Sequence, residues 1–253
     1  MQIAICIITV TGCTQSKMKP IPYLNNGQKW DKSIMILGDW DDNPETPHTY
    51  LHWAPVNVGY DASGEVASRD DHRVGRLFQW GAGDEETNKL AKERYYNEPK
   101  PDFWYTQMEN MEGFYTGELW NNAKGPCPKG WRLPNATEFK VLMAGKHGAY
   151  GWTTSGNYAG MDSYKGIELF GMNEDMTPGT GVFFPAAGNI NGLGSASAFG
   201  EMGEYWTSGA ERVANPHGFD EIGIASALIF NEESCYIKSV RHSFGHSVRC
   251  VHD

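Results

Sequence analysis

The sequence predicts a single loop-rich α+β domain with few short helices, and three observations support this prediction. The chain of 253 residues contains 30 glycines and 13 prolines, which favours many turns and disfavours long helices. Its apolar runs are short, and one segment, residues 136–144, carries the signals of a helix. Hydrophobic residues make up 40% of the chain and aromatic residues 13%, which is enough to build a substantial core.

The helix predicted over residues 136–144 has a signal at each end. Asn135 suits the N-cap position, and Glu138 three residues later completes a capping-box pattern. Gly145 stands where a left-handed C-cap residue is needed. The apolar residues between them recur at the i, i+3, i+4 spacing of one helical face: Phe139, Leu142 and Met143. We therefore expect this helix to pack on a sheet.

The other elements are predicted from shorter patterns. Asp84 and a Glu85–Lys89 pair indicate a second helix over residues 84–96. Segments 226–230 and 235–240 flank a four-residue polar loop, which predicts a hairpin. Further strands are expected at residues 33–37, 75–80, 181–185, 205–208 and 248–251. The Gly-, Ser- and Ala-rich segments 188–204 and 209–225 are expected to form surface loops.

The first residues of the chain have the pattern of a lipoprotein leader. Residues 3–10 form an apolar run of eight, which is too short to span a membrane and suits a signal peptide. The following Val10-Thr-Gly-Cys13 resembles a bacterial lipobox. This predicts a lipoprotein signal peptide and lipobox in residues 1–19, with lipid on Cys13, and a tether with a first strand in residues 20–52. No basic residue precedes the apolar run, and the alternative is an ordinary N-terminal strand with a buried Cys6.

Charge and hydropathy exclude two classes of partner. The formal net charge is −10, so the phosphate backbone of a nucleic acid would be repelled. No run of eighteen apolar residues exists that would span a bilayer as a helix. We therefore expect no nucleic-acid partner and attachment to a membrane by a lipid anchor only.

Catalytic and metal-binding motifs are not convincing in this sequence. It contains no nucleophile elbow, no P-loop and no zinc-protease motif. His242 and His246 have the spacing of helical zinc ligands, but on a strand they would lie about 13 Å apart, so we expect two solvated histidines. Glutamates 201, 204 and 211 are likewise expected to be solvated in loops rather than paired as acid and base.

A calcium loop is suggested by residues 39–43 but is incomplete. Pro44 stands where such a loop requires glycine, and Tyr50 stands where it requires glutamate. We therefore expect no cofactor and no metal, while a structural calcium loop of another type stays open as an alternative.

Six blocks of the sequence resemble, in order, the Fibrobacter succinogenes major paralogous domain, a family of extracytoplasmic bacterial proteins abundant in Bacteroidetes. The blocks are Trp53–Gly59, Gly75–Gly81, Cys127–Pro134, Val182–Gly188, Tyr205–Ser208 and Gly245–Val251. They place the domain at residues 53–253. The resemblance implies the C-type lectin-like fold of formylglycine-generating enzymes and of retroelement variable proteins, with a loop-rich mixed sheet.

The resemblance also implies a disulfide between Cys127 and Cys250. Cys6 would leave with the signal peptide and Cys13 would carry lipid, which leaves Cys235 as a buried thiol. The alternative pairing is Cys235–Cys250, across adjacent strands. A disulfide is typical of oxidising compartments, so we expect an extracytoplasmic lipoprotein of the outer membrane or cell surface.

The function implied by the resemblance is display of loops from a rigid core. We expect a non-enzymatic cell-surface lipoprotein for ligand binding or adhesion, with a protein or glycan ligand. The C-terminal region is the variable one in retroelement-diversified relatives, so diversified loops there are a further expectation by analogy. The candidate ligand-binding residues lie in the C-terminal region: Arg212, Asn215, His217, Phe219, His242, Phe244 and His246.

Three alternatives stay open. In the first, the candidate aromatic residues belong to the core and the candidate histidines are polar residues without a binding role. The second is a secreted enzyme related to the formylglycine-generating group, which uses two closely spaced cysteines, whereas Cys235 and Cys250 are fifteen residues apart. The third is a structural subunit, such as the tip component of a surface fibre.

Overall fold

In a computed structural model the chain is mostly β, with one short helix among the described residues. The structure describes residues 34–39, 49–60, 73–81, 93–94, 96–98, 104, 120, 125–128, 130–144, 151–158, 161–172, 178–214 and 221–252. The predicted signal peptide, the lipobox with Cys13, and Cys6 lie outside these residues. So does the predicted tether up to β1. Within the described part, no helix has the length and apolar character needed to cross a bilayer.

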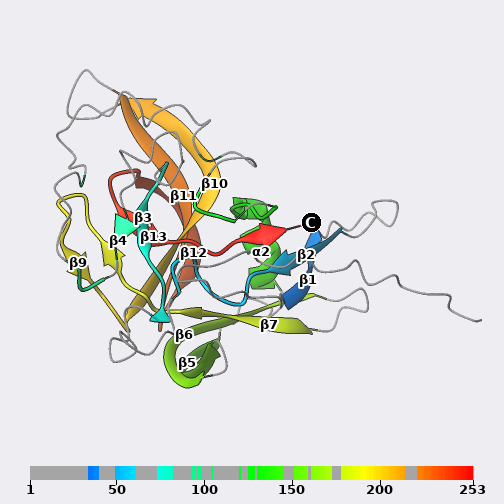
Figure 1. The fold of residues 1–253 in the computed structure, drawn as a ribbon. Coiled ribbons are helices and arrows are strands. Elements are labelled where there is room, and N and C mark those ends of the chain that lie inside the picture. The colour runs from blue at the N-terminus through cyan, green and yellow to red at the C-terminus, as the bar shows by residue number, and fades with distance from the viewer. Residues whose placement is uncertain are drawn as a thin grey trace, which may run out of the picture.

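Three sheets make up the described part (Figure 1). The first is antiparallel, in the order β1 (Ile34–Asp39), β2 (Thr49–Trp53), β14 (Val251–His252). The second, antiparallel, has the order β5 (Gly151–Tyr158), β6 (Met161–Met172), β7 (Pro178–Pro185).

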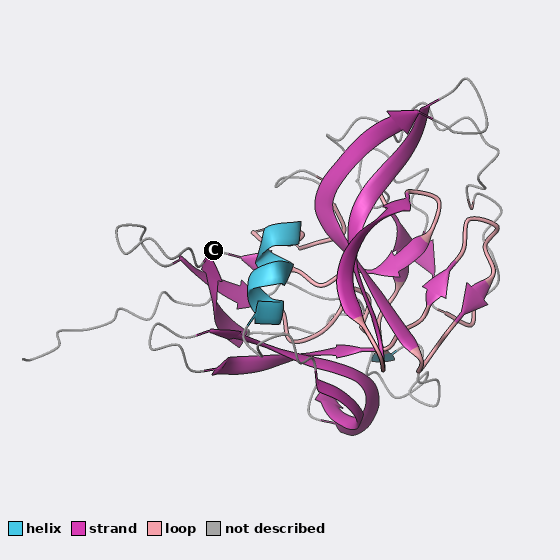
Figure 2. Ribbon diagram, turned by 180° about the vertical axis from the view of Figure 1, so that it is seen from behind, coloured by secondary structure: helices cyan, strands magenta, loops and turns pink. Residues whose placement is uncertain are grey.

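The largest sheet is mixed, because β10 and β13 run parallel while its other pairs are antiparallel. Its order is β12 (Cys235–Arg241), β11 (Glu221–Asn231), β10 (Met202–Ala214), β13 (Gly245–Ser247), β3 (Leu77–Gln79), β4 (Glu93–Arg94). A small hairpin of β8 (Asn189–Ile190) and β9 (Ala196–Ser197) joins it at β13. Figure 2 shows the long β10 and β11 strands as a curved ribbon.

The helix α2 (Ala136–Ala144) forms where the sequence predicts it, and its capping box is present. The Glu138 N–H donates to Asn135 Oδ1 at 2.8 Å, and the Asn135 N–H donates to Glu138 Oε2 at 2.7 Å. Phe139 and Leu142 are buried, and the helix contacts β6 and β1. The predicted helix therefore packs against strands of two sheets, and Figure 2 shows it lying over them.

Residues 248–252 join the C-terminal region to the rest of the domain. Cys250 forms a disulfide with Cys127, with their Cα atoms 5.8 Å apart, so the implied pairing is confirmed. The alternative Cys235–Cys250 pairing is wrong, because Cys235 is a free, half-buried thiol. Backbone hydrogen bonds link Val251 with Arg132 in both directions at 2.8 Å. The middle and the C-terminal region of the chain are therefore connected both covalently and by hydrogen bonds.

Arg249 is the most deeply buried charge in this region. Its guanidinium donates to Asn57 Oδ1 at 2.8 Å and to the carbonyl oxygens of Ala54 and Phe183 at 3.0 Å each. The ring of Phe184 lies 4.8 Å from the guanidinium carbon. Burial lowers the pKa of this guanidinium. A buried charge is tolerated only when it is hydrogen-bonded, and Arg249 satisfies this condition.

Several predicted elements differ from the structure. The predicted loop 209–225 is largely strand, because β10 extends to Ala214 and β11 begins at Glu221. Small residues therefore do not mark a loop by themselves: earlier on the same strand β10, Gly203 makes room for the Phe230 ring of β11. The second predicted helix, residues 84–96, is wrong at its C-terminal end, because Glu93–Arg94 forms the strand β4. Residues 84–92 lie outside the described part. The strand predicted at 33–37 and the hairpin predicted at 226–240 are confirmed as β1 and as β11–β12.

Candidate ligand-binding site

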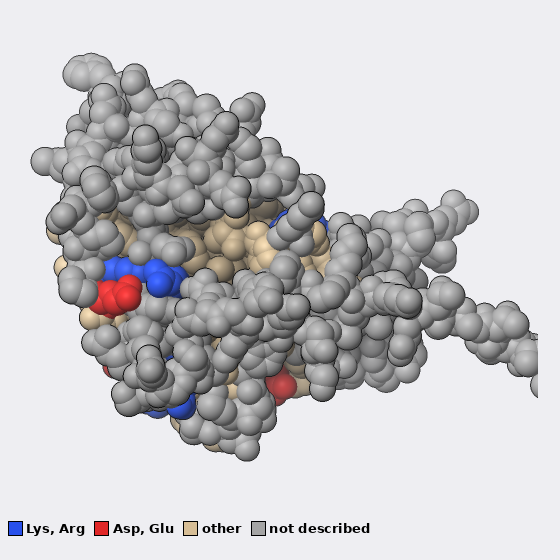
Figure 3. All heavy atoms as spheres, in the orientation of Figure 1, with Lys and Arg blue, Asp and Glu red and all other residues tan. Residues whose placement is uncertain are grey.

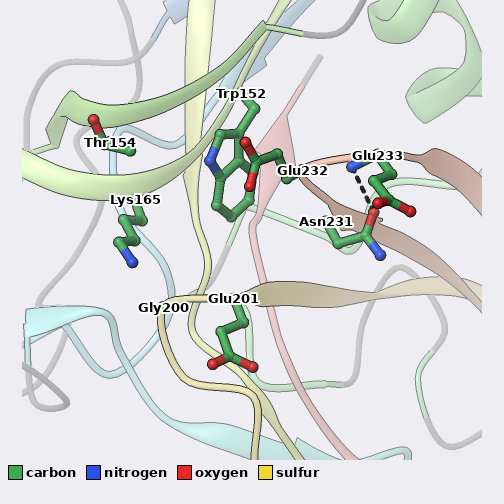
Figure 4. A pocket seen from close by; sticks show the side chains of 8 residues that line it. All are labelled: Trp152, Thr154, Lys165, Gly200, Glu201, Asn231, Glu232 and Glu233. Atoms are coloured by element: carbon green, nitrogen blue, oxygen red, sulfur yellow. Dashed lines mark hydrogen bonds between the residues drawn. The ribbon is translucent and has the colours of Figure 1, made fainter.

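An open groove on the surface, which we call the Trp152 groove, is formed by three separate parts of the chain (Figure 4). Its volume is about 410 Å³. The β5–β6 hairpin, the turn before β10 and the β11–β12 turn contribute its walls. The lining residues are Trp152, Thr154, Lys165, Gly200, Glu201, Asn231, Glu232 and Glu233.

The aromatic wall of the groove is held by the core. Trp152 lies on β5 opposite Ile167 of β6, and its half-buried ring packs against the buried cluster around Phe184. Lys165, on β6, is exposed, and its carbonyl oxygen accepts a hydrogen bond from the Ala186 N–H at 2.8 Å. Both side chains therefore extend from backbone that is fixed by the sheet.

The turn before β10 places Glu201. Ala198 and Gly200 have positive φ angles of 62° and 73°, a conformation that glycine adopts without strain. The Gly200 N–H donates to the Ala186 carbonyl at 2.8 Å, and the Glu201 N–H donates to the Ala198 carbonyl at 3.1 Å. This turn leaves the Glu201 side chain exposed at the groove.

The β11–β12 turn fixes the orientation of the Asn231 amide. Its Oδ1 accepts from the Glu233 N–H at 2.9 Å, the Ser234 N–H at 2.8 Å and the Ser234 hydroxyl at 3.0 Å. With the amide oxygen occupied, Nδ2 is the free end of this side chain, and within the described part of the chain it has no partner. Asn231 therefore brings a pre-oriented hydrogen-bond donor to the groove.

Four charged side chains surround the groove, one ammonium and three carboxylates, an excess of two negative charges. They are Lys165, Glu201, Glu232 and Glu233. All four are exposed, and among the described residues none of them forms an ion pair. Their charges therefore remain available to a bound molecule. On the face drawn in Figure 3, one group of described basic side chains lies beside an acidic group, and the other described charges are scattered.

None of the seven candidate binding residues is among the described residues that line this groove. Arg212 lies on β10, with its Cα paired to Gly223 of β11. Three others, Asn215, His217 and Phe219, lie outside the described residues, between β10 and β11. The remaining three, His242, Phe244 and His246, lie close to the core.

The expectation that His242 and His246 are solvated is wrong. His242 is 2% exposed and stacks on Trp80, with ring centroids 4.6 Å apart. His246 is fully buried, with its ring edge-on to Trp206 at 4.1 Å. Phe244 is half-buried and packs against the same core cluster. These side chains pack in the interior rather than extending from a flexible loop.

Glu204 is buried as well, contrary to its predicted solvation. Its Oε2 lies 2.6 Å from His246 Nδ1, and its Oε1 accepts from Asn189 Nδ2 at 2.9 Å. Burial alone would raise the pKa of Glu204, but the adjacent imidazole and these hydrogen bonds lower it below its usual value. The pair joins β10 to β13 and is therefore a structural link inside the large sheet.

Cys235, Cys250 and the incomplete calcium loop were the other candidates for enzymatic or metal chemistry. Burial raises the pKa of the Cys235 thiol to about 12, and Cys250 is held in its disulfide. Asp39 ends β1, and residues 40–43 of the loop lie outside the described part. Among the described residues there is no cluster of three side chains suited to a metal ion.

Sequence reasoning missed the Trp152 groove because no local motif encodes it. Its residues come from segments near 152–165, 200–201 and 231–233, which only the folded sheets bring together. One signal was present: the polar loop of the predicted 226–240 hairpin supplies Asn231, Glu232 and Glu233.

Comparison with known proteins gives one match. No curated protein and no solved structure matches the chain, so the implied C-type lectin-like fold stays a prediction. The Fibrobacter succinogenes major domain matches residues 52–252, which is well over half of the chain. This region includes the described strands from β3 to β14, the helix and the Cys127–Cys250 disulfide. The chain therefore belongs to the Fibrobacter succinogenes major domain family.

Proposed function

We propose that this protein is a non-enzymatic, extracytoplasmic binding lipoprotein that recognises a protein or glycan ligand in the Trp152 groove. The observation that carries the proposal is the groove itself. It combines an aromatic ring with four exposed charges and an oriented amide on a sheet scaffold. Concave sites of this volume with a few convergent polar groups are the usual form of ligand sites.

The state of the cysteines favours binding over the alternative enzyme. A two-cysteine reaction needs accessible thiolates, but Cys250 is bound to Cys127 and burial raises the pKa of Cys235 to about 12. The disulfide also favours an oxidising compartment outside the cytoplasm. Within this proposal, lipid on Cys13 anchors the protein at the outer membrane or cell surface, and the tip of the β10–β11 ribbon forms a second, diversified contact region.

The proposal is tested with the full chain carrying Cys13→Ser, so that it is produced without lipid. This protein is applied to a glycan array and to cells, together with the variant Trp152→Ala. Leu193→Ala is the matched control, because Leu193 is a 63% exposed apolar side chain that does not line the groove. We expect a binding signal that Trp152→Ala removes and Leu193→Ala leaves unchanged. No binding to any glycan or cell type would overturn the proposal.

The anchor is tested separately by labelling cells with a fatty-acid analogue. The wild-type protein should carry the label and Cys13→Ser should not. Equal labelling of the two proteins would show that Cys13 is not the lipidated residue.

A further inference from the structure

We propose that the ligand of the Trp152 groove is a neutral saccharide, and that the groove discriminates against anionic glycans. This inference rests on the proposed binding function and specifies its ligand. It follows from the aromatic ring, the set of hydrogen-bonding groups, the charge and the size of the groove.

The half-buried ring of Trp152 provides an apolar platform at the groove. Because this side chain packs against the core, little conformational freedom is lost when a ligand covers its accessible part. The face of an indole carries negative charge density, and the C–H bonds on one face of a sugar ring are weakly positive. A pyranose ring laid on Trp152 therefore gains both apolar burial and a favourable electrostatic contact.

The polar groups around this platform include both donors and acceptors. Lys165 Nζ and Asn231 Nδ2 donate, the carboxylates of Glu201, Glu232 and Glu233 accept, and the Thr154 hydroxyl does both. Sugar hydroxyls also donate and accept, so a saccharide offers partners to both kinds of group. A purely cationic ligand would leave the Lys165 ammonium and the Asn231 amide without acceptors, and the ammonium would repel it.

The charge of the groove selects among saccharides. The excess of two negative charges repels a uronic acid or a sulfated sugar, whereas a neutral sugar meets no such penalty. The volume of about 410 Å³ lies in the range of about 300–1,000 Å³ that is usual for small-molecule sites. The groove therefore suits a short saccharide segment rather than a single ion.

The test uses the full chain carrying Cys13→Ser and three sets of probes: neutral oligosaccharides, uronic-acid or sulfated oligosaccharides of equal length, and an oligolysine peptide. Binding is measured by calorimetry and by NMR chemical shifts. We expect neutral saccharides to bind, with affinity reduced about ten-fold or more by Trp152→Ala. Trp152→Phe retains an aromatic face and should recover part of this affinity, which separates loss of the platform from loss of folding.

Charge variants test the selectivity independently. The double variant Glu232→Lys and Glu233→Lys reverses the sign of an exposed wall and should admit anionic oligosaccharides that the parent protein rejects. Glu168→Gln, which removes one negative charge from a residue outside the groove, should leave the selectivity unchanged.

Each contrary result has its own meaning. Binding of neutral saccharides that neither Trp152→Ala nor the charge reversal alters would overturn this inference and leave a binding function at another site. Trp152-dependent binding of oligolysine or of anionic sugars alone would overturn the ligand class but keep the groove. Failure of all three probe sets, combined with binding to cells that depends on Trp152, would point to a protein ligand and refute the saccharide. If the protein binds neither the three probe sets nor cells, the proposed function is refuted as well.

Discussion

Reduction of the Cys127–Cys250 disulfide should destabilise the domain strongly, because the bond closes a very long loop. The two cysteines are 123 residues apart. In the chain-entropy model a closed loop of this length lowers the entropy of the unfolded chain by about 16 cal/mol/K, which corresponds to about 5 kcal/mol at 25 °C. Native disulfides in small domains usually contribute about 2–5 kcal/mol, so the expected loss on reduction lies in this range, with about 5 kcal/mol as its upper end.

The assay compares one sequence in two redox states, so that no side chain is changed. The full chain with Cys13→Ser is unfolded in guanidinium with and without a thiol reductant, and tryptophan fluorescence reports the transition. Free energies follow from the midpoints and slopes. Because the sequence is the same in both states, the difference reports the loss of the covalent bond and not the loss of a side chain.

A mass-spectrometric peptide map identifies the bond that was reduced, and Cys235→Ala serves as the control because Cys235 is free. The control should unfold like the parent under oxidising conditions. Superimposable transitions for the oxidised and reduced chains would refute the closure argument, and a peptide joining residues 235 and 250 would refute the pairing.

Three further predictions concern other buried groups. Burial and the charge of His252 lower the pKa of His52 below 6.5. The contribution of neutral His52 to stability is therefore full above that pH and is lost as the pH falls below it. Urea midpoints should fall between about pH 8 and about pH 5, and a flat profile would contradict this. Gly203→Ala should cost about 1–3 kcal/mol, because the new Cβ would lie 2.1 Å from the Phe230 ring, whereas Gly209→Ala on the same strand meets nothing closer than 3.7 Å and should be nearly neutral in thermal melts. The Cys235 thiol should react slowly with iodoacetamide while the protein is folded and rapidly in denaturant, since burial raises its pKa to about 12; equal rates would contradict its burial.

Local signals predicted local structure well. Helix 136–144 was predicted from its caps and its apolar spacing, and both hydrogen bonds of the N-terminal capping box are present, while the predicted C-cap residue Gly145 lies outside the described residues. The 226–240 hairpin followed from two apolar runs around a polar loop. The disulfide came from family resemblance rather than from spacing, because a separation of 123 residues carries no geometric information by itself.

Long-range arrangement could not be predicted in the same way. Glu204 and His246 are adjacent only because β10 and β13 pair in parallel, with Tyr205 opposite Ser247, and no local pattern encodes that pairing. The same sheet buries His242 and His246, which the polar character of histidine argues against. The Trp152 groove depends on three chain segments meeting, so its residues were visible but their proximity was not.

The location of residues 245–252 has a consequence for biogenesis. This stretch supplies β13 to one sheet, β14 to another, the buried guanidinium of Arg249 and one sulfur of the disulfide. A nascent polypeptide that lacks it has two unfinished sheets, and Cys127 has no partner for its disulfide. Folding of the complete domain therefore waits until synthesis has delivered these eight residues, and the strand edges that they pair with stay open until then.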